Sequence, residues 1–150
     1  MNVKIEVFNA DDMFHQQAAN RVSDWSLRAD TVLTVQPEEV AGYPYSIFAL
    51  NEFGVALGHV AVVNYENNVA TIGRFIVSTY FREIGIGGLM LGYLTETLGE
   101  NFPDMEKCLV YSTYESTRFF EKAGGVFAGF RNPILPGRAN WITDLMPAIK

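Results

Sequence analysis

Cysteine is almost absent from this chain of 150 residues, and Cys108 is the only one. A single cysteine can form no intrachain disulfide and completes no cysteine-based zinc site, so we expect a reducing compartment and no metal cofactor. Cys108 lies in the apolar run Cys108-Leu109-Val110. A lone cysteine in such a run is usually a small core side chain, and we expect that role rather than that of a nucleophile.

Basic residues are also few. The chain has 11 Lys and Arg against 17 Asp and Glu, which gives a net charge of −6. No basic stripe is available to replace the counterions of a nucleic acid, so we expect no nucleic-acid partner. An acidic excess mildly favours cationic partners such as amines, although it also simply keeps a protein soluble.

Long apolar runs are missing. No stretch is long enough to span a membrane, and residues 1–7 alternate between polar and apolar side chains instead of forming the apolar core of a signal peptide. We therefore expect a cytoplasmic protein with no membrane partner.

Apolar and aromatic side chains, by contrast, are plentiful. Apolar residues make up 49% of the chain, with eleven Phe and seven Tyr among them. A chain of this length ordinarily forms one domain and can bury about two-thirds of its unfolded surface. We expect a single domain over residues 1–150, with a substantial core.

The first half of the chain predicts a strand, a helix and a strand meander. Residues 3–7 alternate like a strand, and Asp11-Asp12 is an N-cap signal for a helix that ends at about Arg28. Pro37 is typical of the first position of a short helical turn over residues 37–40. The short connections that follow predict three antiparallel strands, over residues 45–50, 55–65 and 69–77.

The second half predicts two helices among three more strands. Apolar residues at helical spacing indicate a helix of about fifteen residues, its apolar face formed by Ile86, Leu89, Met90, Tyr93, Leu94 and Leu98. Strands are expected at 107–111, 126–130 and 141–146. Between the first two, Ser112 and Glu115 form a capping-box pattern for a helix that ends at Gly124-Gly125. The fold class is therefore α/β (α+β), with a mixed, mostly antiparallel sheet of about seven strands and helices on both faces.

The glycine-rich turn Arg82-Glu83-Ile84-Gly85-Ile86-Gly87-Gly88 lies between a strand and a helix. The first turn of a helix carries unpaired N–H groups and a partial positive charge, which favour an anion. Each glycine there costs up to about 1 kcal/mol relative to alanine, so three of them need a reason. That reason is either close packing of the helix against a strand or close approach of an anionic ligand, and the arginine favours the ligand.

Two segments resemble the motifs of one enzyme family. Arg82-x-x-Gly85-x-Gly87 is similar to the Gln/Arg-x-x-Gly-x-Gly/Ala signature of the Gcn5-related N-acetyltransferases (GNAT), and the flanking Phe75-Ile76-Val77 and Leu89-Met90 also look like its first motif. The later run Phe119-Phe120-Glu121-Lys122-Ala123-Gly124-Gly125 resembles the family's Leu-Tyr-Glu-Lys-x-Gly-Phe segment. The two motifs span residues 55–130 in the order of elements that a GNAT fold has.

The resemblance implies a binding site for acetyl-CoA. In this family the backbone N–H groups of the glycine loop hold the pyrophosphate of CoA, which here implies Arg82, Glu83, Ile84, Gly85, Ile86, Gly87 and Gly88. The pantetheine arm would run along Phe75, Ile76 and Val77 like an added strand, and a backbone N–H near Ile76 or Val77 would polarise the thioester carbonyl. The helix that carries Thr113, Phe119 and Phe120 would flank the other side of the arm.

The resemblance also implies a reaction, the direct attack of a primary amine on the thioester of acetyl-CoA. The acceptor would be a small molecule or a protein amino group, bound mainly by residues 21–45 and 131–141. No metal is needed, and members of the family often form homodimers. The expected activity is that of an N-acetyltransferase.

The residues that would move protons depart from the family pattern. Phe120 occupies the position of a frequent tyrosine acid, and Thr113 that of a common asparagine. Tyr111 and Tyr114 are nearby candidates for the acid, although each is more often a packed or surface tyrosine. Thr71 stands where some members carry a glutamate base and cannot serve as one. His59, on one strand face with Leu57, Ala61 and Val63, is a candidate, although a histidine among apolar neighbours is more often a satisfied core residue. Glu52 and Glu66 at strand ends could act through a water but are more often solvated surface acids, so no base is assigned.

Two alternative functions follow from these departures and from the glycines. A catalytically silent module that binds or senses acyl-CoA would have the same fold and would explain Phe120. A dinucleotide-binding fold would place its glycines in a first parallel βαβ unit with an acid after the second strand. Here a meander precedes the glycines and Leu109-Val110-Tyr111 supplies no acid, which disfavours that fold.

Overall fold

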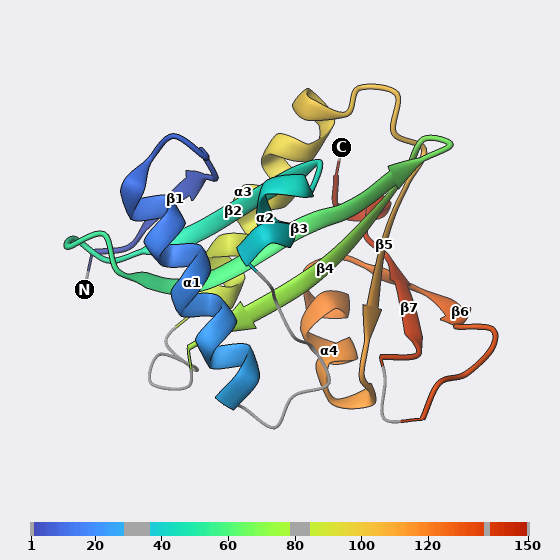
Figure 1. Ribbon diagram of the computed structural model, residues 1–150. Coiled ribbons are helices and arrows are strands. Elements are labelled where there is room, and N and C mark those ends of the chain that lie inside the picture. The colour runs from blue at the N-terminus through green and yellow to red at the C-terminus, as the bar shows by residue number, and fades with distance from the viewer. Residues whose placement is uncertain (1, 29–36, 79–84, 137–138, 150) are drawn as a thin grey trace.

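The chain forms one continuous sheet of seven strands in the order β1-β2-β3-β4-β5-β7-β6 (Figure 1). The computed structural model describes residues 2–28, 37–78, 85–136 and 139–149. Its elements are β1 (Lys4–Val7), α1 (Met13–Arg28), α2 (Pro37–Gly42), β2 (Tyr45–Leu50), β3 (Ala56–Glu66), β4 (Val69–Val77), α3 (Ile86–Asn101), β5 (Lys107–Ser112), α4 (Tyr114–Lys122), β6 (Val126–Phe130), β7 (Trp141–Asp144) and the short 3-10 helix η2 (Met146–Ala148).

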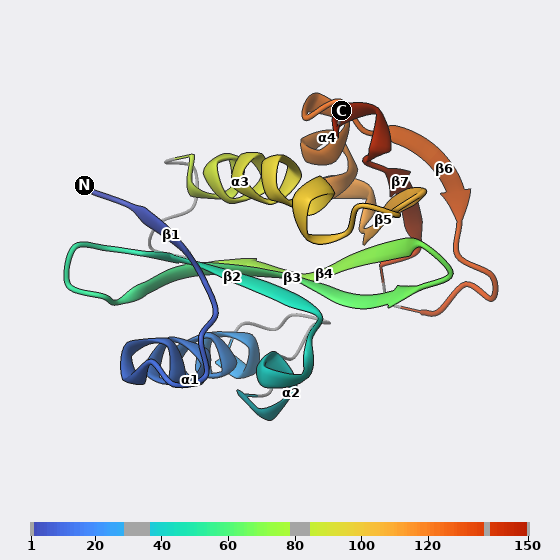
Figure 2. The same cartoon turned by 90° about the horizontal axis from the view of Figure 1, so that it is seen from above.

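The sheet is sandwiched between helices. Figure 2 shows α1 and α2 on one face and α3 and α4 on the other. Strands β4 and β5 pair in parallel, while the other neighbouring strands pair antiparallel. The predicted mixed, mostly antiparallel sheet with helices on both faces is therefore confirmed.

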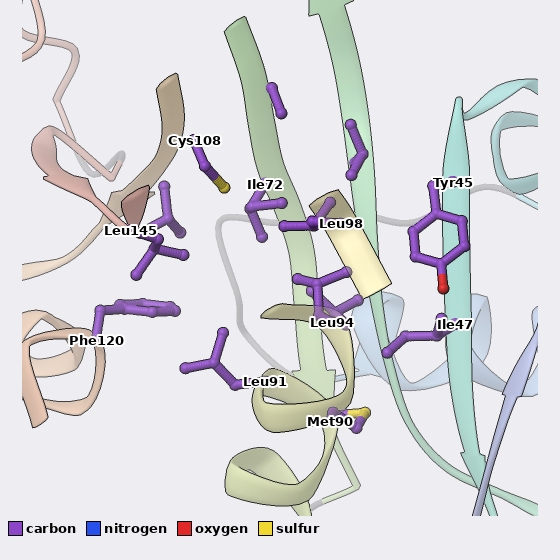
Figure 3. Packing of buried hydrophobic residues seen from close by; sticks show 14 of the residues in the cluster. Tyr45, Ile47, Ile72, Met90, Leu91, Leu94, Leu98, Cys108, Phe120 and Leu145 are labelled. Atoms are coloured by element: carbon purple, nitrogen blue, oxygen red, sulfur yellow. The ribbon is translucent and has the colours of Figure 1, made fainter. Parts of the chain in front are cut away.

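Two apolar clusters fill the space between these layers. The larger, the α3-side core, joins α3 to the inner face of the sheet, with Leu94 and Leu98 at its centre (Figure 3). The smaller, the α1-side core, packs α1 and α2 against Phe48 and Leu50. Full burial of one such aliphatic side chain contributes about 1.5–3 kcal/mol.

Cys108 belongs to the α3-side core. Its side chain is fully buried near Ile72 and Leu145 (Figure 3). Burial, with a smaller effect of the Asp144 charge, raises the pKa of its thiol to about 12. The expectation that Cys108 is a core side chain is confirmed.

Three local predictions at helix and strand ends need correction. Leu89 is 54% exposed, and the α3 face is completed instead by buried Leu91. The capping box of α4 is Thr113 with Ser116, not Ser112 with Glu115, because the β5 backbone runs on through Ser112. Strand β7 ends at Asp144, whose Oδ1 accepts a hydrogen bond from the Met146 N–H at 2.9 Å and turns the chain into η2.

A bulge in β3 changes which side chains share a face. The register with β2 passes from Ala49–Gly58 to Leu50–Ala56, so Leu57 is an extra residue. Leu57 packs in the α3-side core, whereas the His59 ring lies 4.9 Å from the ring of Phe48 on the opposite face. The expectation that His59 shares a face with Leu57 is wrong, because the bulge interrupts the period-two alternation.

A second bulge lies in β4. The register with β3 passes from His59–Ile76 to Ala61–Gly73, so Arg74 and Phe75 together face one residue of β3. Arg74 takes a left-handed backbone conformation with φ 53°. Bulges of this kind bend a strand and often lie beside active sites.

Candidate functional site

The two parallel strands at the centre of the sheet separate before they end. Their pairing runs from Val69–Lys107 to Ile72–Val110, after which β4 continues to Val77 and β5 to Ser112. Figure 1 shows the strands diverging toward their C-terminal ends. In the described part of the chain, the β5-facing edge of residues 73–76 therefore has no strand partner, and its peptide groups can pair with an extended ligand.

The bulge at the start of this free edge is held from inside the sheet. His59 is fully buried, and its Nδ1–H donates to the Arg74 carbonyl oxygen at 2.9 Å. Because a neutral ring with a proton on Nδ1 accepts at Nε2, the Ser46 hydroxyl donates there, at 2.6 Å. Burial lowers the pKa of His59 to about 4, so the ring is neutral near pH 7. Both ring nitrogens are occupied, which leaves neither for an acceptor amine.

The helix after the free edge begins with the predicted glycines. Gly85 is the N-cap of α3 and has φ 86°, a conformation that glycine adopts without strain. The first helical hydrogen bond runs from the Leu89 N–H to the Gly85 carbonyl oxygen at 3.1 Å. The N–H groups of Ile86, Gly87 and Gly88 precede it and thus have no acceptor within the helix.

Packing does not account for these glycines. A Cβ at Gly85 or Gly88 would meet no atom of the described residues within 4 Å. One at Gly87 would lie 3.4 Å from Phe119 Cζ and 3.6 Å from Phe75 Cε1, which is ordinary van der Waals contact. Close packing against the described residues is therefore not the reason for glycine at Gly85 or Gly88, and at Gly85 the φ of 86° itself favours glycine.

Three phenylalanine rings connect the glycine turn, β4 and α4. The Phe75 ring centroid lies 5.5 Å from that of Phe119 and 5.9 Å from that of Phe120. A Cβ built at Gly87 would reach the rings of Phe119 and Phe75. Four of the predicted site residues are therefore neighbours: Phe75, Gly87, Phe119 and Phe120. Three others lie outside the described residues: Arg82, Glu83 and Ile84.

A cleft of about 560 Å³ opens where β4 and β5 part. Its walls come from β3, β4, β5, α4 and the segment that follows β6. Of the predicted site residues, Phe75, Tyr111, Thr113, Phe119 and Phe120 line it, and Phe120 is only 4% exposed. His59 does not line it.

The two candidate tyrosines have different surroundings. Tyr111 is 36% exposed and lines the cleft. Tyr114 is 70% exposed, stacks edge-on against Trp141, and lines a separate hollow of about 460 Å³. Only Tyr111 is thus placed to meet a ligand in the cleft.

The cleft also contains residues that the sequence analysis missed. Ser116 hydrogen-bonds to the Thr113 hydroxyl at 3.0 Å, and Ser112 to the Thr117 hydroxyl at 2.8 Å. Arg74 and Arg131 line the cleft from β4 and from the residue after β6. The hydroxyl-rich run 112–117 was a usable signal, but the two arginines are 57 positions apart and no local pattern joins them.

Metal-binding clusters and membrane-spanning helices each have a distinct structural signature. The described residues contain no group of three or more His, Cys, Asp or Glu side chains placed to hold a metal ion. None of the helices in the same part of the chain combines the length and the apolar character needed to cross a membrane.

Comparison with known proteins identifies the fold. No protein-family model matches the chain, and no curated protein does. Among solved structures, an acetyltransferase of the GNAT family from Staphylococcus aureus superposes with a TM-score of 0.73 at 13% identity, over 96% of this chain and 99% of that one. Ard1 from Thermoplasma volcanium gives a TM-score of 0.73 at 16% identity, over 95% of both chains.

A third neighbour was solved with a ligand. The catalytic domain of the Tetrahymena Gcn5 histone acetyltransferase, in complex with coenzyme A, gives a TM-score of 0.68 at 11% identity, over 95% of this chain and 91% of that one. The fold of the Gcn5-related N-acetyltransferases, expected from the two motifs, is therefore confirmed.

Proposed function

We propose that the chain is an acetyl-CoA-dependent N-acetyltransferase, formed as a single domain over residues 1–150. One observation carries the proposal: the parting of β4 and β5 places a free strand edge beside a helix that starts with unpaired amides. A fold shared with acetyltransferases, one of them solved with coenzyme A, supports it. Two sequence motifs also favour this function: Arg82-x-x-Gly85-x-Gly87 and residues 119–125.

The binding of acetyl-CoA would use backbone groups more than side chains. Its pyrophosphate would accept hydrogen bonds from the N–H groups of Ile86, Gly87 and Gly88, where the helix dipole favours negative charge. The pantetheine arm would pair with the β5-facing edge of residues 73–76. Phe119 and Phe120 would pack against the arm from α4.

The transfer step needs polarisation of the thioester and the movement of two protons. The amine nitrogen attacks the carbonyl carbon, a C–N bond forms, and the C–S bond breaks to release CoA as a thiolate. A backbone N–H near Ile76 would stabilise the charge that develops on the carbonyl oxygen. One proton leaves the ammonium before attack, and a second passes from the nitrogen toward the thiolate.

The side chains of the cleft indicate how these protons move. No carboxylate, histidine or lysine is among the described residues that line it. The attacking species would therefore be the neutral fraction of the amine in solution. A thiol with a pKa of about 8.5 is a good leaving group. Among the described lining residues Tyr111 carries the most acidic type of hydroxyl, which would return a proton to the thiolate.

Replacement of Tyr111 by phenylalanine tests this role. We expect Tyr111→Phe to lower kcat about tenfold, because it removes the hydroxyl and retains the ring. Tyr114→Phe makes the same change outside the cleft and should leave kcat within twofold of wild type. Thiol release from acetyl-CoA at saturating amine measures both, and equal kcat in the two variants would remove Tyr111 from the mechanism.

A panel experiment tests the function as a whole. Acetyl-CoA at 100 times its Kd should raise the free energy of unfolding by about 2.7 kcal/mol, and a thermal-shift assay detects a change of this size. Primary amines of varied size should then release thiol from acetyl-CoA. If no acyl-CoA stabilises the protein, the proposal is wrong.

A silent acyl-CoA-binding module is the second candidate. The specific observation in its favour is Phe120, which occupies the tyrosine position of the resembled motif and cannot donate a proton. Stabilisation by acetyl-CoA without turnover of any amine in the panel would identify the chain as such a module.

A further inference from the structure

Two arginine residues line the cleft of a chain whose net charge is −6. Arg74 reaches it from the bulge of β4, and Arg131 from the segment after β6. Among the described lining residues there is no Asp or Glu. The local charge of the cleft is thus opposite to that of the whole chain, and it overrides the mild preference for cationic partners that the composition predicts.

Arg74 is held in place by α2. Its Nε–H donates to the Tyr43 hydroxyl oxygen at 3.1 Å, and its Nη2 lies 3.8 Å from Glu39 Oε2. The Tyr43 hydroxyl in turn donates to the same Glu39 oxygen at 2.9 Å. These contacts fix the guanidinium and compensate part of its charge, so Arg74 contributes a background field rather than the main contact to a ligand.

Arg131 has a different set of contacts. Its guanidinium carbon lies 5.6 Å from the centroid of the Tyr111 ring. No carboxylate of the described residues lies within ion-pair distance of it. A ring face stabilises the charge but takes none of the five N–H donors in the guanidinium plane, which remain available to a carboxylate.

The two sides of the cleft are distinct. Phe75 and Phe119, whose rings a Cβ at Gly87 would touch, lie on the side from which the pantetheine arm would enter under the proposed function. Arg131 lies beside Tyr111 on the β5 side. A ligand group that meets Arg131 therefore belongs to the second substrate and not to the arm.

We infer that the acceptor is an amine that also carries a carboxylate, such as an amino acid, and that Arg131 binds this carboxylate. The inference rests on the proposed transferase function and names its substrate class. Arginine is suited to the role because its planar fork matches the two oxygens of a carboxylate. The acceptor nitrogen would then point toward the thioester carbonyl between β4 and Tyr111.

Matched pairs of amines test the inference. We expect α-amino acids to be acetylated from acetyl-CoA with kcat/KM, expressed per neutral amine, roughly tenfold to a hundredfold higher than their α-carboxamides, the range expected for charge-assisted hydrogen bonds. Arg131→Gln should reduce this preference to about threefold or less, chiefly through KM, and Arg131→Lys should keep part of it. Arg118→Gln removes an equal charge from α4 outside the cleft and should keep all of it. Equal kcat/KM per neutral amine for acids and amides in the wild-type protein would overturn the inference and leave the transferase function intact.

Two further measurements distinguish an acidic acceptor from an acidic acyl group and from a protein without transferase activity. If the carboxylate belonged to the acyl group, succinyl-CoA would be used better than acetyl-CoA in an Arg131-dependent manner with plain alkylamines, and the acceptor assignment would be wrong. If no amine is turned over, the proposed function fails, but calorimetry of amino acids added to the protein saturated with CoA still decides the inference. Binding that weakens tenfold or more in Arg131→Gln supports it, and absence of binding overturns it.

Discussion

Replacement of Gly88 by glutamate should abolish the binding of acetyl-CoA and leave the fold intact. Gly88 is exposed in the first turn of α3, and a Cβ there meets no described atom within 4 Å. A carboxylate at that position stabilises the helix itself, because it interacts favourably with the helix dipole. The same charge repels the pyrophosphate and occupies its place, so we expect affinity to fall on the order of a hundredfold or more.

Two control variants separate charge from bulk and from position. Gly88→Gln adds a side chain of the same shape without the charge and should weaken binding much less. Gly92→Glu adds the charge one turn further along α3, again into open space, and should bind acetyl-CoA nearly as wild type does. Gly85 is less suited to the test, since any side chain there would also strain a residue with φ 86°. Wild-type affinity for acetyl-CoA in a folded Gly88→Glu protein would show that the diphosphate does not bind at the start of α3.

The stability of the protein should fall steeply below pH 6.5 because of one buried histidine. His59 has a pKa of about 4 in the folded protein, against an ordinary value of 6.5. The contribution of neutral His59 to the free energy of unfolding is complete above pH 6.5 and is lost as the pH falls toward 4. In this range the ring binds a proton in the unfolded chain but not in the folded chain, so acid favours unfolding. The shift corresponds to about 3 kcal/mol of unfolding free energy between pH 7 and pH 4.

Urea titrations at several pH values measure this effect. His59→Gln has no titrating ring, so its free energy of unfolding should fall about 3 kcal/mol less than that of wild type between pH 7 and pH 4. Ser46→Ala disturbs the same hydrogen bonds but keeps the ring, and should retain the pH dependence. Parallel curves for wild type and His59→Gln would show that the ring is not buried in its neutral form.

Local patterns predicted most of the fold. Strands β2 and β4 begin and end at the predicted residues, and α1 starts directly after Asp12, whose carboxylate accepts a hydrogen bond from the Phe14 N–H at 2.8 Å. Alternation and N-cap chemistry are properties of adjacent residues, so the sequence contains them directly. The errors lie where strand pairing in the sheet, rather than the local sequence, determines the structure. The Leu57 bulge and the continuation of β5 through Ser112 depend on pairing with neighbouring strands.

The same distinction applies to the candidate site: its contiguous motifs could be predicted, and its contacts between distant segments could not. The glycine turn and the strand end Phe75-Ile76-Val77 form contiguous motifs, and each could be predicted from the residues around it. The cleft could not, because residues from β3 to the segment after β6 meet there only through the topology of the sheet. Arg74 lines the cleft at the bulge of β4, and Arg131 lines it from the residue after β6, which pairs with β7.

The separation of β4 from β5 also has a consequence for folding. The meander β2 to β4 is built from contacts between strands adjacent in the chain, which are expected to form early at little cost in loop entropy. One wall of the cleft arises only after α3 has crossed the sheet and β5 has closed a parallel pair with Val69 to Ile72. We therefore expect the cleft to form late in folding. Partial opening of the β5-β7-β6 end would destroy it while the meander and its core still stand.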